Sequence, residues 1–178
     1  MGIFNRIFGG NQKESQNDSI TNEIDQLIFK ANASAITCFN SLVDDFPKLK
    51  IIPELNLLKE FDKIVTIANV GIVMLQVSHY FNSKDTQKYI LEINKGISRW
   101  DEASTKELIY FGRYINDLTN RNQINSIDDM SEAIGAFVFI NLYENNSESI
   151  ELEPLTNEVD LFFSLGSILT MTFSNYWN

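Results

Sequence analysis

Basic residues are missing from the last third of this 178-residue chain, which has no lysine or arginine after Arg121. Residues 122–178 hold nine acids, whereas the first 121 residues hold fifteen acids and fourteen bases, so most of the net charge of −10 lies in the last third. Such a one-sided field repels nucleic acid and anionic lipid and speeds encounter with a basic partner. The segregation therefore predicts which partners the protein attracts or repels, and it does not predict a chemical activity.

Cysteine and histidine occur once each, as Cys38 and His79. One cysteine excludes an internal disulfide framework and a cysteine zinc cluster, and its position in phase with apolar neighbours predicts a small buried side chain. A di-metal site of the helical-bundle kind needs paired Glu-x-x-His motifs, and Gln76 stands three residues before His79. We expect His79 to be a capping or surface residue, and we expect no catalytic residue, metal site or cofactor.

Nucleic-acid binding is also not expected, because the bases form scattered pairs flanked by acids and no basic patch. Phosphate-binding glycine loops are missing as well, since Gly9-Gly10 lacks both a following lysine and a preceding strand.

Strand-like alternation of useful length is missing, and apolar residues instead recur at intervals of three and four. We expect helices over about 19–46, 53–81, 83–100, 104–118 and 126–140, and from 157 to the terminus. Pro47 should end the first, Ser83 should cap the third, and either Ser104 with Glu107 or Asp101 should cap the fourth. The prediction is an all-α, compact bundle of five or six helices. Its buried side chains should include Phe39, Leu58, Ile72, Phe111, Phe137 and Leu169, with close helix contacts at Gly71, Gly135 and Gly166.

The first ten residues form a short amphipathic unit that Gly9-Gly10 should end, and the polar residues 11–18 should form a linker. We therefore divide the chain into residues 1–18 and a single helical domain over 19–178. Three roles remain open for the unit, namely packing on its own domain, docking to another protein, and contact with a membrane interface. Its docking residues would be Ile3, Phe4, Ile7 and Phe8.

Residues 64–83 and 161–178 carry no formal charge and resemble membrane spans in length. In the first stretch, however, Asn69 and Gln76 continue a polar stripe that begins at Asp62, and serines interrupt the second. We expect both to be buried core helices, and membrane contact only through residues 1–10. The N-terminus has no secretory signal pattern, so the expected location is cytoplasmic.

The acidic last third is the strongest functional signal in the sequence. Its candidate partner-binding residues are Glu144, Glu148, Glu151, Glu153, Glu158 and Asp160. They form a surface for a basic partner, an ordinary solvated loop, or a weak cation site. We favour a non-enzymatic protein-binding module of inhibitor type, because bacterial immunity proteins that neutralise toxins are likewise small, acidic and free of catalytic motifs. The alternative is a peripheral adaptor that docks to a membrane or a larger assembly through residues 1–10, and an enzyme ranks third.

Overall fold

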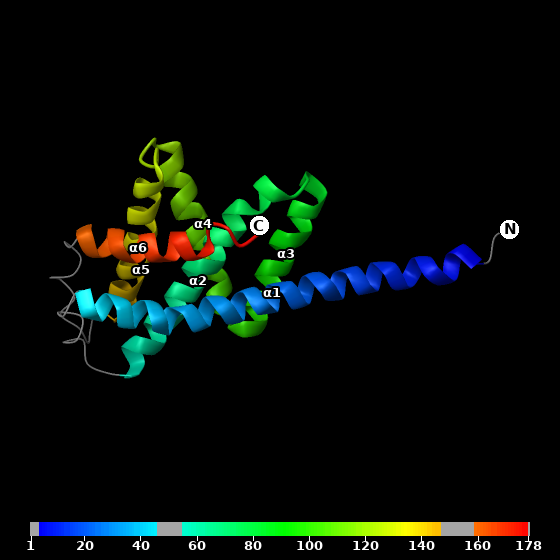
Figure 1. The fold of residues 1–178 in the computed structure, drawn as a ribbon, viewed down its shortest axis with the longest axis horizontal. Coiled ribbons are helices and arrows are strands. Elements are labelled where there is room, and N and C mark those ends of the chain that lie inside the picture. The colour runs from blue at the N-terminus through cyan, green and yellow to red at the C-terminus, as the bar shows by residue number, and fades with distance from the viewer. Residues whose placement is uncertain (1–3, 46–54, 147–158, 178) are drawn as a thin grey trace.

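The computed structural model describes residues 4–45, 55–146 and 159–177, with side chains over 18–35, 37–42, 59–142 and 160–177. The described residues form six helices and no strand, which confirms the all-α bundle (Figure 1). The helices are α1 (Phe4–Asp45), α2 (Leu55–Tyr80), α3 (Ser83–Trp100), α4 (Ser104–Asn120), α5 (Ile127–Asn146) and α6 (Val159–Phe173).

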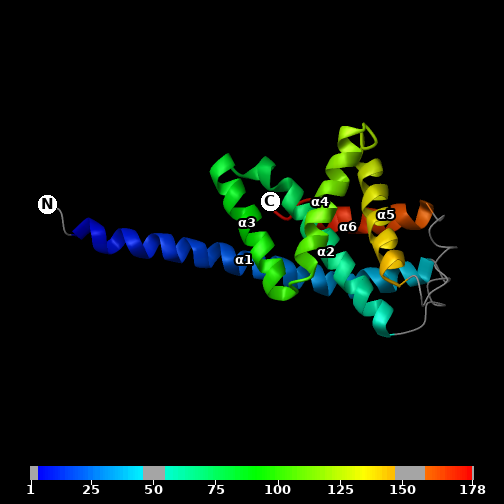
Figure 2. The same cartoon turned by 180° about the vertical axis from the view of Figure 1, so that it is seen from behind.

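Helix α1 has 42 residues, which corresponds to a length of about 63 Å. Two views from opposite sides show its N-terminal part extending well beyond the other five helices (Figures 1 and 2). The expected helix end at Gly9-Gly10 and the linker over residues 11–18 are therefore wrong as secondary structure. Glycine ends a helix most readily in the left-handed conformation, and no glycine among the described residues has a positive φ. The division of the chain at residue 18 stays a prediction.

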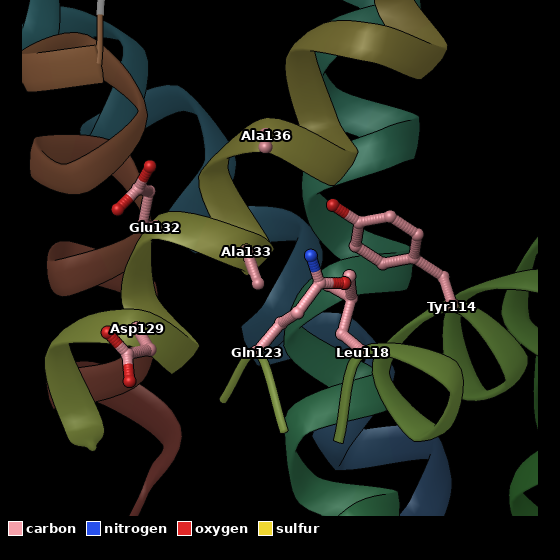
Figure 3. Close-up of a pocket in the computed structure, with 7 residues that line it drawn as sticks. All are labelled: Tyr114, Leu118, Gln123, Asp129, Glu132, Ala133 and Ala136. Atoms are coloured by element: carbon pink, nitrogen blue, oxygen red, sulfur yellow. The ribbon is translucent and has the colours of Figure 1, made fainter. Parts of the chain in front are cut away.

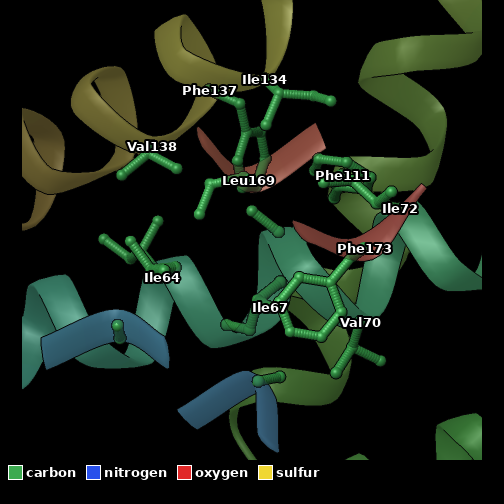
Figure 4. Close-up of a cluster of buried hydrophobic side chains, with 14 of the residues drawn as sticks. Ile64, Ile67, Val70, Ile72, Phe111, Ile134, Phe137, Val138, Leu169 and Phe173 are labelled. Atoms are coloured by element: carbon green, nitrogen blue, oxygen red, sulfur yellow. The ribbon is translucent and has the colours of Figure 1, made fainter. Parts of the chain in front are cut away.

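Helix α2 is the centre of the bundle and packs against each of the five other helices. Figure 4 shows its apolar side chains meeting those of α4, α5 and α6. Among the residues that were predicted to be buried, Ile72, Phe111, Phe137 and Leu169 are buried. Phe39 is only half-buried and packs edge-on against Phe61 with 5.2 Å between ring centroids. The side chain of Leu58 lies outside the described residues.

The polar stripe of α2 points into the bundle and not toward solvent. Asn69 is fully buried, and its Nδ2 donates to Ser34 Oγ at 2.8 Å and to the Ala31 carbonyl at 3.3 Å on α1. Gln76 Nε2 donates to the carbonyl of Phe173 at the end of α6 at 3.3 Å. Residues 59–80 are long and apolar enough to cross a membrane, but 67% of their most apolar window is buried inside the bundle. This burial fits a core helix whose few polar groups join it to its neighbours.

Side-chain capping differs from the sequence prediction at α3 and α4. Asn82, and not Ser83, caps α3, because its Oδ1 accepts from the backbone N–H groups of Lys84 and Asp85 at 3.1 Å. The predicted pair of Ser104 and Glu107 at α4 is wrong. Ser104 lies inside the helix and donates its hydroxyl to Asp101, while Glu107 pairs with Lys63 of α2 at 3.2 Å. The carboxylate of Asp101 thus accepts a hydrogen bond from the first residue of α4.

Helices α5 and α6 cross at unusually short range. A Cβ added to Gly135 would collide with the carbonyl of Phe162, and a Cβ added to Gly166 would collide with the carbonyl of Ser131. Gly71 of α2 meets the ring of Phe111 in the same way. The predicted close approach at all three glycines is confirmed, because a Cβ added at any of them would overlap an atom of a neighbouring helix.

The chain beyond α6 folds back onto the bundle. Trp177 Nε1 donates to the carbonyl of Val73 at 3.1 Å, and the Trp177 ring packs edge-on against Phe81 and Tyr89. The hydroxyl of Tyr176 reaches the carbonyl of Glu23 on α1 at 3.4 Å. The last helix was expected to run to the terminus, but it ends at Phe173 and the tail joins α1, α2 and α3 instead.

Candidate interaction site: the α4–α5 groove

The candidate site lies at the start of α5, where the acidic last third begins. Asp129 Oδ2 accepts from the backbone N–H groups of Asn125 at 2.8 Å and Ser126 at 3.0 Å, and Ser126 Oγ accepts from the Asp129 N–H at 3.1 Å. This reciprocal cap confirms the helix start that was predicted at Ser126. The hydrogen bond from the Asn125 N–H, followed by the bonds to Ser126, holds the pKa of Asp129 below its usual value. Asp129 is therefore fixed in its charged form at the helix start.

Helices α4 and α5 leave a groove between them of about 200 Å³ (Figure 3). The two helices are held together through Phe137, whose ring lies 4.9 Å from that of Phe111 and 5.8 Å from that of Tyr114. Small side chains on the α5 wall leave room for the groove. The lining residues are Tyr114 and Leu118 of α4, Gln123 of the connecting loop, and Asp129, Glu132, Ala133 and Ala136 of α5.

Tyr114 and Glu132 bring an aromatic hydroxyl and a negative charge to the groove. Burial of Tyr114, followed by the nearby Tyr110 and the charge of Glu132, raises the pKa of the Tyr114 hydroxyl. The side chain of Glu132 itself is exposed. Figure 3 shows the Tyr114 ring on the α4 side with its hydroxyl directed toward α5, and both carboxylates on α5. The groove thus combines a half-buried aromatic wall with exposed negative charge.

Apolar surface continues from the groove toward the other end of α5. Ile140 follows Ala136 on the same helical stripe and is 38% exposed. On α4, Tyr110 lies one turn from Tyr114, is 47% exposed, and has its ring 5.9 Å from that of Phe137. The α4–α5 surface is therefore acidic at the Asp129 end and apolar at the Ile140 end.

The charge segregation of the sequence persists in three dimensions. Six acids form ion pairs with lysine or arginine among the described residues, and all six precede Arg121 in the chain. The acids after Arg121 whose side chains are described form no ion pair with any described base. They are Asp128, Asp129, Glu132 and Asp160. The bases are thus partly neutralised by nearby acids of their own part of the chain, and the negative charge of α5 stays exposed.

Most of the predicted site residues lie outside the described part of the chain. Glu148, Glu151, Glu153 and Glu158 are outside it, and only the backbone of Glu144 is described, in α5. Asp160 is exposed in the first turn of α6, where a negative charge complements the helix dipole. Ile3 also lies outside, and Phe4, Ile7 and Phe8 are described only as backbone of α1.

Sequence reasoning missed the groove residues themselves. Asp129 and Glu132 were counted among the acids but were not assigned to the site. Tyr110 and Tyr114 lie beside the buried stripe of α4, and their one-turn spacing was the available signal.

The single cysteine and the single histidine are not among the residues that line the groove. Cys38 is buried as expected, and burial raises the pKa of its thiol to about 12. His79 is exposed in the last turn of α2, as predicted. The described residues contain no group of three histidine, cysteine or acidic side chains placed to hold a metal ion. Comparison with protein families, with curated proteins and with solved structures finds no match to this chain.

Proposed function

We propose that this protein is a non-enzymatic binding module that holds a basic partner protein, in the manner of an inhibitor or immunity protein. The observation that carries the proposal is an acidic set on α5 that forms no ion pair with a described base. It consists of Asp128, Asp129 and Glu132 beside the α4–α5 groove. Unpaired charge of one sign steers a partner of the opposite sign toward the surface that bears it. A cytoplasmic location belongs to the same proposal.

The size of the groove supports a protein partner over a small substrate. Small-molecule sites typically enclose roughly 300–1,000 Å³ and bury most of their ligand. The α4–α5 groove of about 200 Å³ is open along one side and is suited to side chains of a docked surface. This comparison favours binding over catalysis at this position.

The experiment uses the products of the genes adjacent to this one, because an inhibitor of this type is expected to be encoded beside its target. Each purified product is titrated against the full chain by stopped flow over a series of salt concentrations. For the true partner, we expect association to slow steeply past physiological ionic strength, where the screening length falls to about 8 Å or less. Salt should change the dissociation rate much less.

Two matched double variants locate the interaction. Asp128→Asn with Glu132→Gln should slow association with the partner, because it removes two unpaired charges beside the groove. Asp18→Asn with Glu102→Gln removes the same charge from exposed positions in the balanced part of the chain and should have a small effect. A partner that binds with no salt dependence, or with equal sensitivity to both double variants, would contradict the proposal.

An adaptor remains the second candidate, and the geometry of α1 favours it. Ile3, one of the four proposed docking residues, lies outside the described residues. The other three, Phe4, Ile7 and Phe8, belong to the part of α1 that extends beyond the bundle (Figures 1 and 2). If the acidic surface binds the partner, deletion of residues 1–18 should leave inhibition of the partner intact. If the protein is an adaptor, the same deletion should abolish its attachment to a membrane or a larger assembly. The same deletion therefore separates the two candidates.

A further inference from the structure

We propose that the α4–α5 groove receives an amphipathic helix of the partner, with its basic end at Asp129 and Glu132 and its apolar stripe on Tyr110 and Ile140. This inference rests on the proposed function and adds the chemistry and the direction of the bound segment. It follows from the acidic lining of the groove and from the exposed apolar side chains of Tyr110 and Ile140, which continue from it along α4 and α5.

The apolar part of the groove has the dimensions of a helix site. From Asp129, which lines the groove, to Ile140 beyond it, α5 extends about 17 Å, which is the length of roughly three helical turns. Tyr114 of α4 lines the groove with Ala133 and Ala136 of α5. Tyr110 lies one turn from Tyr114, and the two rings lie 5.9 and 5.8 Å from the Phe137 ring. Ile140 lies one turn beyond Ala136 on α5. Exposed aromatic and aliphatic side chains that flank a groove between two helices are the usual contacts of a helix docked by its apolar face.

Charge fixes the direction in which the helix lies. The carboxylates of Asp129 and Glu132 stand at one end of the groove, and Asp128 is exposed in the same first turn of α5. At the other end, Ile140 follows a run of α5 that contains no charged residue after Glu132 until Glu144. Lysine or arginine at one end of the partner helix therefore matches one end of the groove only.

A second groove, between α1 and α3, provides the internal comparison. It is larger, at about 360 Å³, and is flanked by Phe29, which is 74% exposed, and by Trp100. Its charges are already paired, because Arg99 contacts Asp25 at 2.7 Å and Glu92 at 2.9 Å. A ligand chosen by apolar burial alone would prefer this groove, whereas a basic amphipathic helix should prefer α4–α5.

The test uses a synthetic peptide of about 14 residues made of leucine, alanine and lysine, long enough to span the groove as a helix. The leucines lie on one helical face and the lysines are grouped at one end. Titration into the ¹⁵N-labelled full chain should shift the amide signals of Tyr110, Tyr114, Glu132 and Ile140. A nitroxide at the lysine end should broaden the signal of Asp129 most, and a nitroxide at the other end should broaden that of Ile140 most.

Variants separate the apolar contact from the charge. Tyr110→Ser with Ile140→Ser should weaken peptide binding about tenfold, because two exposed apolar contacts are lost. Phe29→Ser with Trp100→Ser makes an apolar change that is at least as large at the α1–α3 groove and should leave the affinity unchanged. Asp128→Asn with Glu132→Gln should weaken binding about three- to tenfold and remove the directional broadening. Circular dichroism of each variant verifies that the fold is retained.

Three results would overturn the inference. The first is shifts confined to the α1–α3 groove, and the second is equal binding by a peptide with the same composition but scattered leucines. The third is no shift in the α4–α5 groove at about millimolar peptide, where even a Kd of about 1 mM is detectable. None of these results bears on the salt dependence of association with the natural partner, which tests the proposed function separately. Loss of that salt dependence, with the peptide still bound in the groove, would instead contradict the function alone.

Discussion

Substitution of alanine for Gly135 or Gly166 sets helix propensity against packing. Alanine is favoured over glycine within a helix by about 1 kcal/mol, so propensity alone predicts a more stable protein. In this bundle the added Cβ would overlap the backbone carbonyl of Phe162 or Ser131 on the neighbouring helix. A carbonyl in a helix cannot rotate away as a side chain does, so α5 and α6 have to separate. Overpacking of this kind costs about 1–3 kcal/mol, occasionally more.

Separation of the two helices has a second cost. At each glycine the Cα–H that replaces the missing Cβ points at a carbonyl oxygen, which is the geometry of a weak hydrogen bond worth about 0.5–1 kcal/mol. The contact between Phe139 and Phe162, with 5.5 Å between ring centroids, would also loosen. Together these terms outweigh the propensity gain. We expect each variant to lose about 0.5–3 kcal/mol of unfolding free energy.

Gly112 provides the control. A Cβ at this position in α4 would meet only the flexible Met74 Cε at 3.5 Å, an ordinary contact distance. Gly112→Ala should therefore gain up to about 1 kcal/mol from propensity. Urea unfolding followed by circular dichroism measures all three variants under the same conditions. If Gly135→Ala or Gly166→Ala proved as stable as Gly112→Ala, the close approach of α5 and α6 would be refuted.

Three further predictions concern single titratable groups. Cys38, whose pKa burial raises to about 12, should react with a thiol reagent at pH 8 only after unfolding, and rapid stoichiometric labelling of the folded protein would contradict its burial. The pKa of Asp129 is lowered in the folded state, so its contribution to stability is present above its unfolded pKa of about 3.9 and is lost as the pH falls through the lower folded pKa. Asp129→Ala should thus be less stable than the parent at pH 7, and the difference should shrink as the pH falls below about 3.9, as measured by urea unfolding over this range. The opposite sign applies to Asp62, because burial raises its pKa and ionisation at neutral pH therefore opposes folding. Asp62→Asn should be more stable than the parent at pH 7 and equal to it near pH 3, and a loss of stability at pH 7 would show that the charge is favourable.

The presence of each helix could be predicted from the sequence because it follows from local periodicity. The residues at which a helix begins and ends depend instead on which of several nearby side chains makes the capping hydrogen bond. At α3, Asn82 and Ser83 are both good caps, and only the backbone geometry selects Asn82. At α4 the carboxylate of Glu107 was expected to cap its own helix, but Lys63 on α2 binds it instead. The sequence of α4 alone does not show that a lysine on another helix competes with the backbone for the Glu107 carboxylate.

The groove could not be predicted for a related reason. The sequence shows that acids outnumber bases after Arg121, but it does not show which acids find a basic neighbour in space. Arg99 pairs with Asp25, which is distant in sequence, whereas Glu132 has no such partner among the described residues. The predicted site residues were chosen by local density of acid, and the groove depends instead on where α4 and α5 separate.

The folded-back tail has a consequence for the order of folding events. Tyr176 and Trp177 contact Glu23 of α1 and Val73 of α2 across sequence separations of 153 and 104 residues. Contacts at such separations carry a large loop-closure entropy, so we expect them to close late in folding. Until they close, α1 lacks the hydrogen bond from Tyr176, and the face of α2 near Phe81 lacks the indole that covers it. Docking of the tail is therefore a late step that joins α1 to the rest of the bundle.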